Sequence, residues 1–285
     1  MGYSMFNELY IRLKNLFLNE DYDDGYGDED EIEFPINDPH YDKLEDVLEA
    51  AKCTLNPDGT YSCKGFVDLE WYLGESKVTQ LPVKFKETGS FLCNGGHLTT
   101  LEGCPEIVNG VFGCDGNSLT SLKGGPKVVK TVYGCGRNQL TSLEGAPEVV
   151  GNEFDCSENN LVSLEGGPKE VRGSYECSKN KNLISLKGSA KKIGGWFACK
   201  DCGLTTLAGG PRNVESDFYC GENNLTSLEG GPEIVGGNFR CSDNQLTSLK
   251  GAPKMVGKRI MFRNNPIADE LNRTFIEGSE LHKYV

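Results

Sequence analysis

The chain of 285 residues has no long hydrophobic run, no surplus of basic residues and few histidines. Its longest apolar stretches are a few residues, too short for a helix that spans a bilayer, so no membrane association is expected. Acidic residues outnumber basic ones by 42 to 29. This balance argues against direct nucleic-acid binding, which needs a basic face to displace counterions from phosphates. The three histidines, His40, His97 and His282, lack the spacing of metal ligands.

Residue patterns that support catalysis are also scarce. Glycine-rich segments such as residues 230–237 lack the lysine of a phosphate-binding loop. Cys199 and Cys202 have the spacing of a redox or zinc half-site, but no second pair accompanies them, and a structural role for both thiols is favoured. No nucleophile with a neighbouring base is recognisable. We therefore expect a protein that is not an enzyme and that needs no cofactor or metal.

The acidity belongs to the N-terminal segment. Residues 1–60 hold 16 acidic and 4 basic side chains, whereas the rest of the chain holds 26 and 25. Nine carboxylates and no base lie between Glu20 and Glu33. Such a block repels itself, so a disordered or loop stretch is expected near residues 20–37. A solvated linker is the simplest interpretation, and a mimic of a polyanion that competes for a basic partner is the alternative.

Two helices are predicted around this acidic stretch. Apolar residues three and four apart indicate an amphipathic helix over about residues 3–19, and the polar residues that interrupt it do not fit a signal peptide. A second helix is predicted to begin at Asp38 and Pro39. Its apolar stripe consists of Leu44, Val47, Leu48 and Ala51. Residues 1–52 thus form an acidic helical segment, and a turn at residues 56–59 joins short strands in an N-terminal cap over residues 53–90.

A repeat of about 21 residues occupies most of the remaining chain. Each copy has a cysteine with Phe or Tyr two positions before it and, in most copies, Asn three positions after it. Leu-Thr-Ser-Leu or a variant follows, then Gly-small-Pro, then Val or Ile with glycines. The repeated cysteines are Cys93, Cys114, Cys135, Cys156, Cys177, Cys199, Cys220 and Cys241. Eight copies at this spacing predict a solenoid of stacked coils.

Each repeated position has a physical role in such a stack. The aromatic residue and the cysteine alternate with period two, so both point inward from one short strand. The asparagine can bond backbone groups of its own coil and of a neighbour, which builds a ladder of satisfied amides. The two leucines fill the core behind the strand. Coils stacked about 4.8 Å apart then produce a continuous parallel sheet on one face.

Twelve cysteines do not indicate a disulfide framework here. Eight of them share one inward position, where parallel side chains have poor geometry for bridging and a thiol acts as a small buried hydrophobe. Cys53 and Cys63 are the best candidate pair, because they could face each other across the turn at residues 56–59. Reduced thiols are nevertheless expected at these two positions as well.

Residues 140–147 read Leu-Thr-Ser-Leu-Glu-Gly-Ala-Pro, and close variants recur over residues 53–265. In this pattern the chain resembles leucine-rich-repeat proteins of the short bacterial type, and it is similar to repeat proteins of large tailed phages. The resemblance implies a curved, β-rich solenoid of about 9–10 coils with a parallel sheet on its concave face. It also implies a protein-binding role, and the likeness to phage proteins implies a host factor as the partner and the bacterial cytoplasm as the location.

The two ends of the repeat array are expected to be covered. A degenerate first coil with an insertion at residues 70–77 precedes the solenoid proper, which spans residues 91–265. A capping helix is predicted over residues 266–285, because the last coil would otherwise expose its core. One repeat is irregular: it has an extra residue near Lys181 and Asn182, and Ala190 stands where other copies have proline. This break either bends the stack or is a tolerated insertion.

Residues that flank the inward pair point outward from the sheet and vary between repeats. They predict a binding face with an acidic sector, an aromatic centre and a basic sector, although a solvated face without a partner is the alternative. The residues expected to bind a partner are Asp155, Glu176, Trp196, Lys200, Tyr219 and Arg240. Glu153 and Glu158 extend the acidic sector, and Arg259 and Arg263 extend the basic one.

These features together favour a non-enzymatic scaffold that binds a host protein and inhibits or redirects it. Two other functions stay open. In the first, the acidic N-terminal segment mimics DNA and the solenoid is a spacer. In the second, the chain is an extracellular adhesin or glycan-binding repeat protein, which would carry oxidised cysteines.

Overall fold

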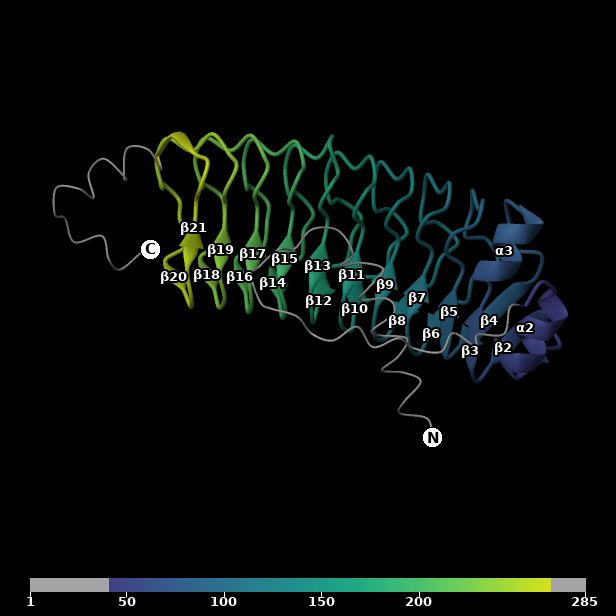
Figure 1. Cartoon of the computed structure of the whole chain (residues 1–285). Helices are drawn as coiled ribbons and strands as arrows, with labels where there is room; N and C mark the ends of the chain where they lie inside the picture. The colour runs from purple at the N-terminus through teal and green to yellow at the C-terminus, as the bar shows by residue number, and fades with distance from the viewer. Residues whose placement is uncertain (1–40, 268–285) are drawn as a thin grey trace, which may run out of the picture. The chain divides into compact units, whose positions relative to one another are not determined.

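Each 21-residue repeat forms one coil, and each coil contributes a short strand to each of two sheets (Figure 1). The computed structural model describes residues 41–267. The chain is a β-solenoid, as the repeat spacing predicted. The predicted amphipathic helix over residues 3–19, the acidic stretch at 20–37 and most of the predicted C-terminal helix lie outside the described residues.

The predicted sheet is a ten-stranded parallel sheet, called here the β3–β21 sheet. Every strand after β5 (Ser90–Leu92) starts at the repeated aromatic position or at Ile260, which replaces it. The other members are β3 (Phe66–Asp68), β7 (Phe112–Gly113), β9 (Tyr133–Gly134), β11 (Phe154–Asp155), β13 (Tyr175–Glu176), β15 (Phe197–Ala198), β17 (Phe218–Tyr219), β19 (Phe239–Arg240) and β21 (Ile260–Met261). Aromatic residues of successive coils are direct partners, as Phe154 and Tyr175 are.

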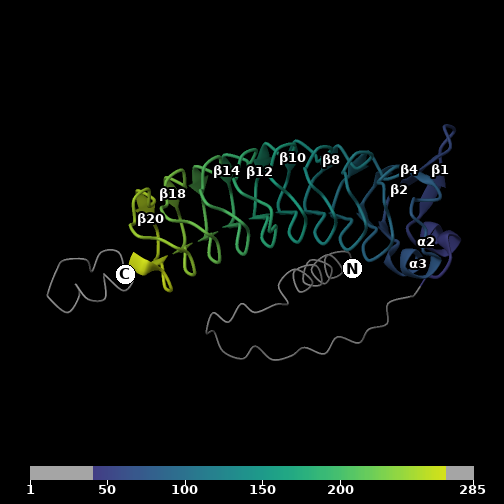
Figure 2. The same cartoon turned by 90° about the horizontal axis from the view of Figure 1, so that it is seen from above.

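A second sheet, called here the β1–β20 sheet, was not predicted. It has eleven strands, and after the antiparallel β1–β2 pair its strands run parallel (Figure 2). Its members are β1 (Cys53–Leu55), β2 (Thr60–Cys63), β4 (Lys84–Thr88), β6 (Ile107–Val108), β8 (Val128–Val129), β10 (Val149–Val150), β12 (Glu170–Val171), β14 (Lys192–Ile193), β16 (Asn213–Val214), β18 (Ile234–Val235) and β20 (Met255–Val256). In most of the two-residue strands the second side chain is buried and the first is exposed.

The interior consists of rows of identical positions. The eight repeated aromatic side chains are fully buried, and the rings of successive coils lie 5.0 to 6.2 Å apart between centroids. The eight repeated cysteines are also fully buried and reduced, and burial raises the pKa of the seven thiols from Cys114 to Cys241. The inward alternation predicted for the aromatic residue and the cysteine is therefore confirmed.

The predicted asparagine ladder is present. Asn159 donates through Nδ2 to the carbonyl oxygens of Cys135, Cys156 and Ser157 at 3.0, 3.2 and 3.0 Å. Its Oδ1 accepts the N–H of Leu140 in the preceding coil at 2.9 Å. Equivalent sets hold Asn117, Asn138, Asn180, Asn223, Asn244 and Asn265. Each asparagine thus links coils through backbone groups that would otherwise be buried and unsatisfied.

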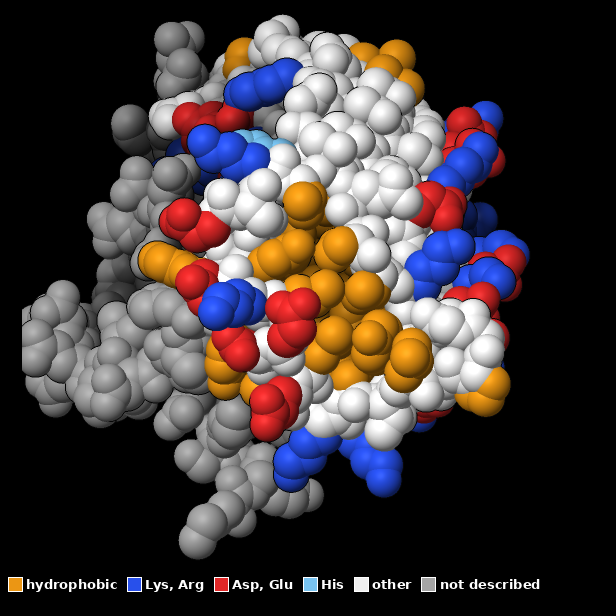
Figure 3. All heavy atoms as spheres, turned by 90° about the vertical axis from the view of Figure 1, so that its right-hand side faces the viewer, with side chains coloured by type: hydrophobic (Ala, Val, Ile, Leu, Met, Phe, Trp, Pro, Cys, Tyr) orange, Lys and Arg blue, Asp and Glu red, His pale blue; other side chains and the backbone are white. Residues whose placement is uncertain are grey.

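The N-terminal end of the stack is closed by two short helices. Helix α2 (Leu44–Ala50) begins at Leu44 rather than at Pro39 as predicted, because Lys43 has an extended backbone. Val47 and Ala51 from the predicted stripe are buried in the core. Helix α3 (Glu70–Ser76) forms the predicted insertion and buries Leu73. Figure 3 shows hydrophobic side chains gathered over this end of the stack.

At the C-terminal end, the structure describes only the first two residues of the helix predicted over residues 266–285, so that helix stays a prediction. Pro266 and Ile267 are helical, and Ile267 packs against the core. Asn265 is buried and bonds the carbonyl oxygen of Cys241 at 3.0 Å. The ladder therefore runs to the last described coil.

The expectation of reduced thiols at Cys53 and Cys63 is wrong. The two residues are direct partners in the antiparallel β1–β2 pair, with their Cα atoms 4.0 Å apart, and a disulfide joins them. The hairpin around the turn at residues 56–59 places the two side chains opposite each other, which parallel coils do not do for the cysteine row. The ten remaining cysteines are reduced.

This arrangement predicts the outcome of thiol counting on the denatured, unreduced protein. Ten thiols should react with a thiol reagent, and twelve should react after reduction. The Cys53→Ser/Cys63→Ser double variant should show ten thiols under both conditions. A count of twelve before reduction would mean that the hairpin does not carry a disulfide, and a count well below ten would mean that cysteines of the row are oxidised.

Candidate functional site

Outward-facing side chains in and directly before β15, β17 and β19 form a compact group on the β3–β21 sheet. Trp196 and Tyr219 meet edge to face, with ring centroids 6.4 Å apart and planes at 86°. The guanidinium of Arg240 lies over the Tyr219 ring, 5.2 Å from its centroid. We call Trp196, Asp217, Tyr219 and Arg240 the aromatic patch. Three of its members were expected from the sequence to bind a partner.

Strand register explains why these residues meet although they are more than 20 positions apart. Ala198, Tyr219 and Arg240 are successive partners across β15, β17 and β19. Trp196 lies two residues before Ala198, so both belong to the outward set of one coil. An edge-to-face aromatic pair and a cation over a ring each contribute roughly 0.5–1.5 kcal/mol, so the patch is ordered without a ligand.

Asp217 is the member that the sequence did not single out. Its carboxylate accepts the Tyr219 hydroxyl at 3.2 Å and the Asn238 N–H at 2.7 Å, and it lies 3.8 Å from the Arg240 guanidinium. Partial burial acts to raise the pKa of Asp217, but the hydrogen bonds from Asn238 and Tyr219 and the charge of Arg240 together lower it. Its signal is an acidic residue directly before the repeated aromatic, a position that Glu153 occupies in one other copy and where the remaining copies have Ser, Val, Trp or Asn.

Lys200 lies on the same coil as Trp196 and interacts with the next coil. Its Nζ is 3.0 Å from a carboxylate oxygen of Glu222, and its backbone N–H donates to the Ser178 hydroxyl at 2.9 Å. Lys200 is therefore placed beside the aromatic patch, with its charge balanced by Glu222.

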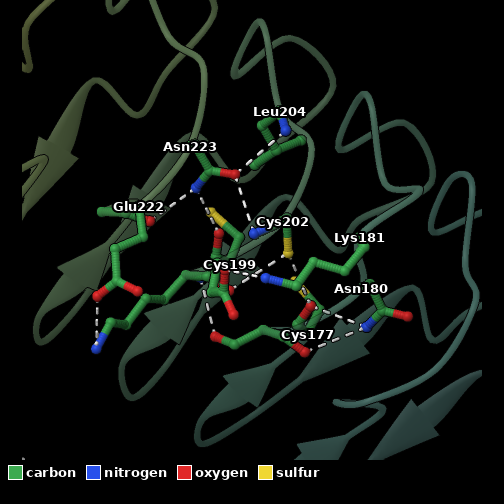
Figure 4. Close-up of polar contacts among 12 residues, drawn as sticks. Cys177, Asn180, Lys181, Cys199, Cys202, Leu204, Glu222 and Asn223 are labelled. Atoms are coloured by element: carbon green, nitrogen blue, oxygen red, sulfur yellow. Dashed lines mark hydrogen bonds and ion pairs between the residues drawn. The ribbon is translucent and has the colours of Figure 1, made fainter. Parts of the chain in front are cut away.

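The irregular repeat keeps its strands in register with the next coil. Figure 4 shows the polar contacts around Cys199 and Cys202 in this region. Cys202 stands where other coils have asparagine, and its thiol donates to the Cys177 carbonyl at 3.4 Å. Since a thiol offers no amide oxygen, the N–H of Leu183 instead donates to the Asn180 carbonyl within its own coil at 2.9 Å. The structural roles predicted for Cys199 and Cys202 are confirmed, and the extra residue is absorbed in the turn.

The two acidic residues expected to bind a partner, Asp155 and Glu176, lie next to each other but are largely buried. Asp155 and Glu176 are partners across β11 and β13. Asp155 is only 2% exposed, and its Oδ1 accepts the Ser157 N–H at 2.8 Å. Glu176 is partly buried, and its Oε1 accepts the Ser178 N–H at 2.7 Å. Burial raises the pKa of both carboxyls, that of Glu176 to about 8, and the charge of Asp155 adds to the shift at Glu176.

A third carboxyl on this face was missed in the sequence. Asp115 follows the cysteine of its coil, is 4% exposed, and accepts the Gly136 N–H at 2.7 Å through Oδ1. Its Oδ2 is buried and has no hydrogen-bond partner in the described part of the chain. Burial and the charge of Asp155 raise the pKa of Asp115. Glu158 and Arg259, also expected on this face, are exposed.

The raised pKa of Glu176 predicts a pH-dependent stability. The folded protein holds the proton more tightly than the unfolded chain, so this carboxyl stabilises the fold below about pH 4.5, and that contribution is lost as the pH rises through about 8. Glu176→Gln should match the wild type at pH 5 and exceed its free energy of unfolding at pH 8.5 by about 1–2 kcal/mol. Urea unfolding at both pH values tests this. Equal stabilities at pH 8.5 would show that Glu176 is not desolvated.

Within residues 41–267, no group of three or more His, Cys, Asp or Glu side chains is placed to hold a metal ion. None of the helices in that range is both long and apolar enough to cross a membrane. Comparison with known proteins found no matching family model, no matching curated protein and no matching solved structure.

Proposed function

We propose that this protein is a non-enzymatic scaffold that binds another protein through the aromatic patch. The observation that carries the proposal is the contact of Trp196, Tyr219 and Arg240 on the outer face of a rigid sheet. Trp, Tyr and Arg are the side chains most enriched at the energetic centres of protein interfaces. Short strands held by the asparagine ladder keep these side chains in place, which lowers the entropic cost of binding.

The repeat pattern supports a more specific form of the proposal. It resembles the short leucine-rich repeats of bacterial effectors and of phage proteins, which implies a host protein as the partner and a cytoplasmic location. The reduced cysteine row supports a reducing compartment over the extracellular adhesin, while the Cys53–Cys63 bridge lies apart from it in the cap.

The test is a binding measurement with a matched control. The protein is used to capture partners from a bacterial lysate, and the affinity of a captured partner is then measured by calorimetry. Trp196→Ala/Tyr219→Ala should weaken binding by about 2 kcal/mol or more, roughly thirtyfold. Val128→Ala/Val149→Ala, which truncates two exposed side chains of the other sheet, should leave the affinity unchanged.

A second variant separates this proposal from the DNA-mimic alternative. Because α2 supplies Val47 to the core and its C-cap residue Ala51 is buried there too, the N-terminal segment should be removed only up to residue 40. The shortened chain should retain full affinity for the partner. Loss of binding on truncation, together with an unchanged affinity of the Trp196→Ala/Tyr219→Ala variant, would assign the function to the acidic segment instead.

A further inference from the structure

The last coils of the solenoid carry a local excess of positive charge. Residues 244–267 hold five basic side chains and no acidic one, although acidic residues outnumber basic ones by 42 to 29 in the whole chain. The five bases are Lys250, Lys254, Lys258, Arg259 and Arg263. The net negative charge of the chain therefore does not extend to this end of the repeat array.

Two of these bases are neutralised by the preceding coil, and three are not. Lys250 and Lys254 are paired with glutamates of that coil, at 2.9 and 3.1 Å. Lys258, Arg259 and Arg263 are exposed, and none of the three forms an ion pair with another described residue. We call these three residues the basic pole. Their like charges repel one another in the free protein, so an anion bound there would relieve the repulsion.

Strand register extends across the basic pole. The Arg259 carbonyl oxygen accepts the Phe239 N–H at 2.8 Å, and the Arg263 carbonyl oxygen accepts the Asp243 N–H at 2.9 Å. Between these two hydrogen bonds, β19 and β21 pair residue for residue. The backbone of residues 259–263 is therefore held in parallel register with the preceding coil.

This register fixes which side chains share a face. Ile260 belongs to the core, and side chains alternate along an extended segment. Arg259, Met261 and Arg263 therefore point outward from the β3–β21 sheet. Arg240, the partner of Met261 in the preceding coil, points the same way. At about 3.3 Å per residue, the Cα atoms of Arg259 and Arg263 are roughly 13 Å apart, with Arg240 between them in the neighbouring coil.

Arg240 joins the basic pole to the aromatic patch. Its guanidinium lies over the Tyr219 ring and 3.8 Å from Asp217, so its own charge is already balanced. The basic pole adds two unpaired guanidiniums on the same face, one coil further along the stack. A ligand that covers the aromatic patch and continues toward β21 would therefore meet uncompensated positive charge.

Building on the proposed function, we infer that the basic pole binds an extended acidic segment of the protein partner, rich in aspartate or glutamate. Alternate residues of an extended peptide point to the same side about 6.6 Å apart, so three carboxylates in alternate positions span about 13 Å, as Arg259 and Arg263 do. A guanidinium can donate two parallel hydrogen bonds to each carboxylate. A single phosphate group is much shorter than this span, and the net charge of −13 opposes a polynucleotide.

Calorimetric titration with a short peptide tests the inference directly. The probe is acetyl-Gly-Asp-Ser-Asp-Ser-Asp-Gly-amide, titrated into the full-length protein at low ionic strength, where exposed charges are least screened. It should bind saturably, whereas the same peptide with asparagine in place of aspartate should bind at least tenfold more weakly. Arg259→Gln/Arg263→Gln should weaken binding of the aspartate peptide at least tenfold, because this variant lacks both unpaired guanidiniums.

Arg172→Gln/Arg212→Gln is the matched control. Both arginines are exposed and are paired with Glu170 and Glu233, at 2.8 and 3.9 Å. The control changes the net charge by the same amount as the double variant of the basic pole but leaves the pole intact. It should retain the affinity for the aspartate peptide, which separates a local site from an effect of net charge.

Three results would overturn the inference: no saturable binding of the aspartate peptide, equal binding of the asparagine peptide, or equal weakening by the two double variants. Tighter binding of an oligothymidylate with the same number of negative charges would also overturn it, by assigning the basic pole to a phosphate backbone. Circular dichroism establishes that each variant is folded. These outcomes are independent of the proposed function, which fails only if Trp196→Ala/Tyr219→Ala leaves the affinity for the whole partner unchanged.

Discussion

Replacing Gly151 with alanine should lower the free energy of unfolding by about 3 kcal/mol or more. A Cβ atom at this position would lie 1.8 Å from the carbonyl oxygen of Lys130 and 2.6 Å from its carbonyl carbon. Both atoms are backbone, so no side chain can rotate away to make room. The coils that carry β8 and β10 would have to separate, which breaks their strand pairing.

Gly74→Ala is the matched control for this change. Gly74 lies inside α3, and a Cβ atom there would meet nothing within 4 Å. Alanine at an unstrained helical position stabilises by roughly 0.5–1 kcal/mol relative to glycine. Urea unfolding of both variants measures the contrast. Equal free energies of unfolding for Gly151→Ala and Gly74→Ala would contradict the close approach of the coils at Gly151 that the two-sheet stack requires.

Asn159→Ala should cost about 1–3 kcal/mol of unfolding free energy. The change removes three hydrogen bonds from Nδ2 and leaves the buried N–H of Leu140 without its acceptor, which was 2.9 Å away. Asn160→Ala is the control, because Asn160 is the adjacent residue of the same type but is exposed. It should change stability by less than about 0.5 kcal/mol.

The irregular repeat offers a second test of the asparagine ladder. Cys202 replaces an asparagine there and leaves Leu183 bonded within its own coil. Cys202→Asn should therefore recover part of a ladder step and raise stability. Equal unfolding midpoints for the Asn159→Ala and Asn160→Ala variants would contradict a structural role for the buried amides.

The repeat pattern made the β3–β21 sheet predictable from the sequence, but it gave no signal for the β1–β20 sheet. Aromatic-x-Cys alternates in polarity and recurs every 21 residues, so the inward direction of Phe154 and Cys156 could be predicted from spacing alone. The β1–β20 sheet uses strands of two residues, such as Val149 and Val150, which are too short to show an alternation. Its strand pairing arises from stacking between coils, and this is a long-range effect.

The candidate site was predictable in part for the same reason. Fixed register places Trp196, Tyr219 and Arg240 on successive coils, so their proximity follows from the repeat. The burial of Asp155 and the pairing of Asp217 with Arg240 depend on side-chain geometry across coils and were not visible in the sequence. The disulfide of Cys53 and Cys63 was missed because the expectation for a row of parallel coils was applied to an antiparallel hairpin.

A map of sulfur positions, obtained from anomalous scattering in crystals of the protein, tests the central claim most directly. If coils of 21 residues stack in register, the sulfurs of the eight repeated cysteines should form one row, each about 4.8 Å from the next, with the Cys53–Cys63 pair beyond its end. That register is what brings Trp196, Tyr219 and Arg240 together. Sulfurs scattered through the molecule, or joined in pairs along the row, would contradict the stack and the binding face built on it.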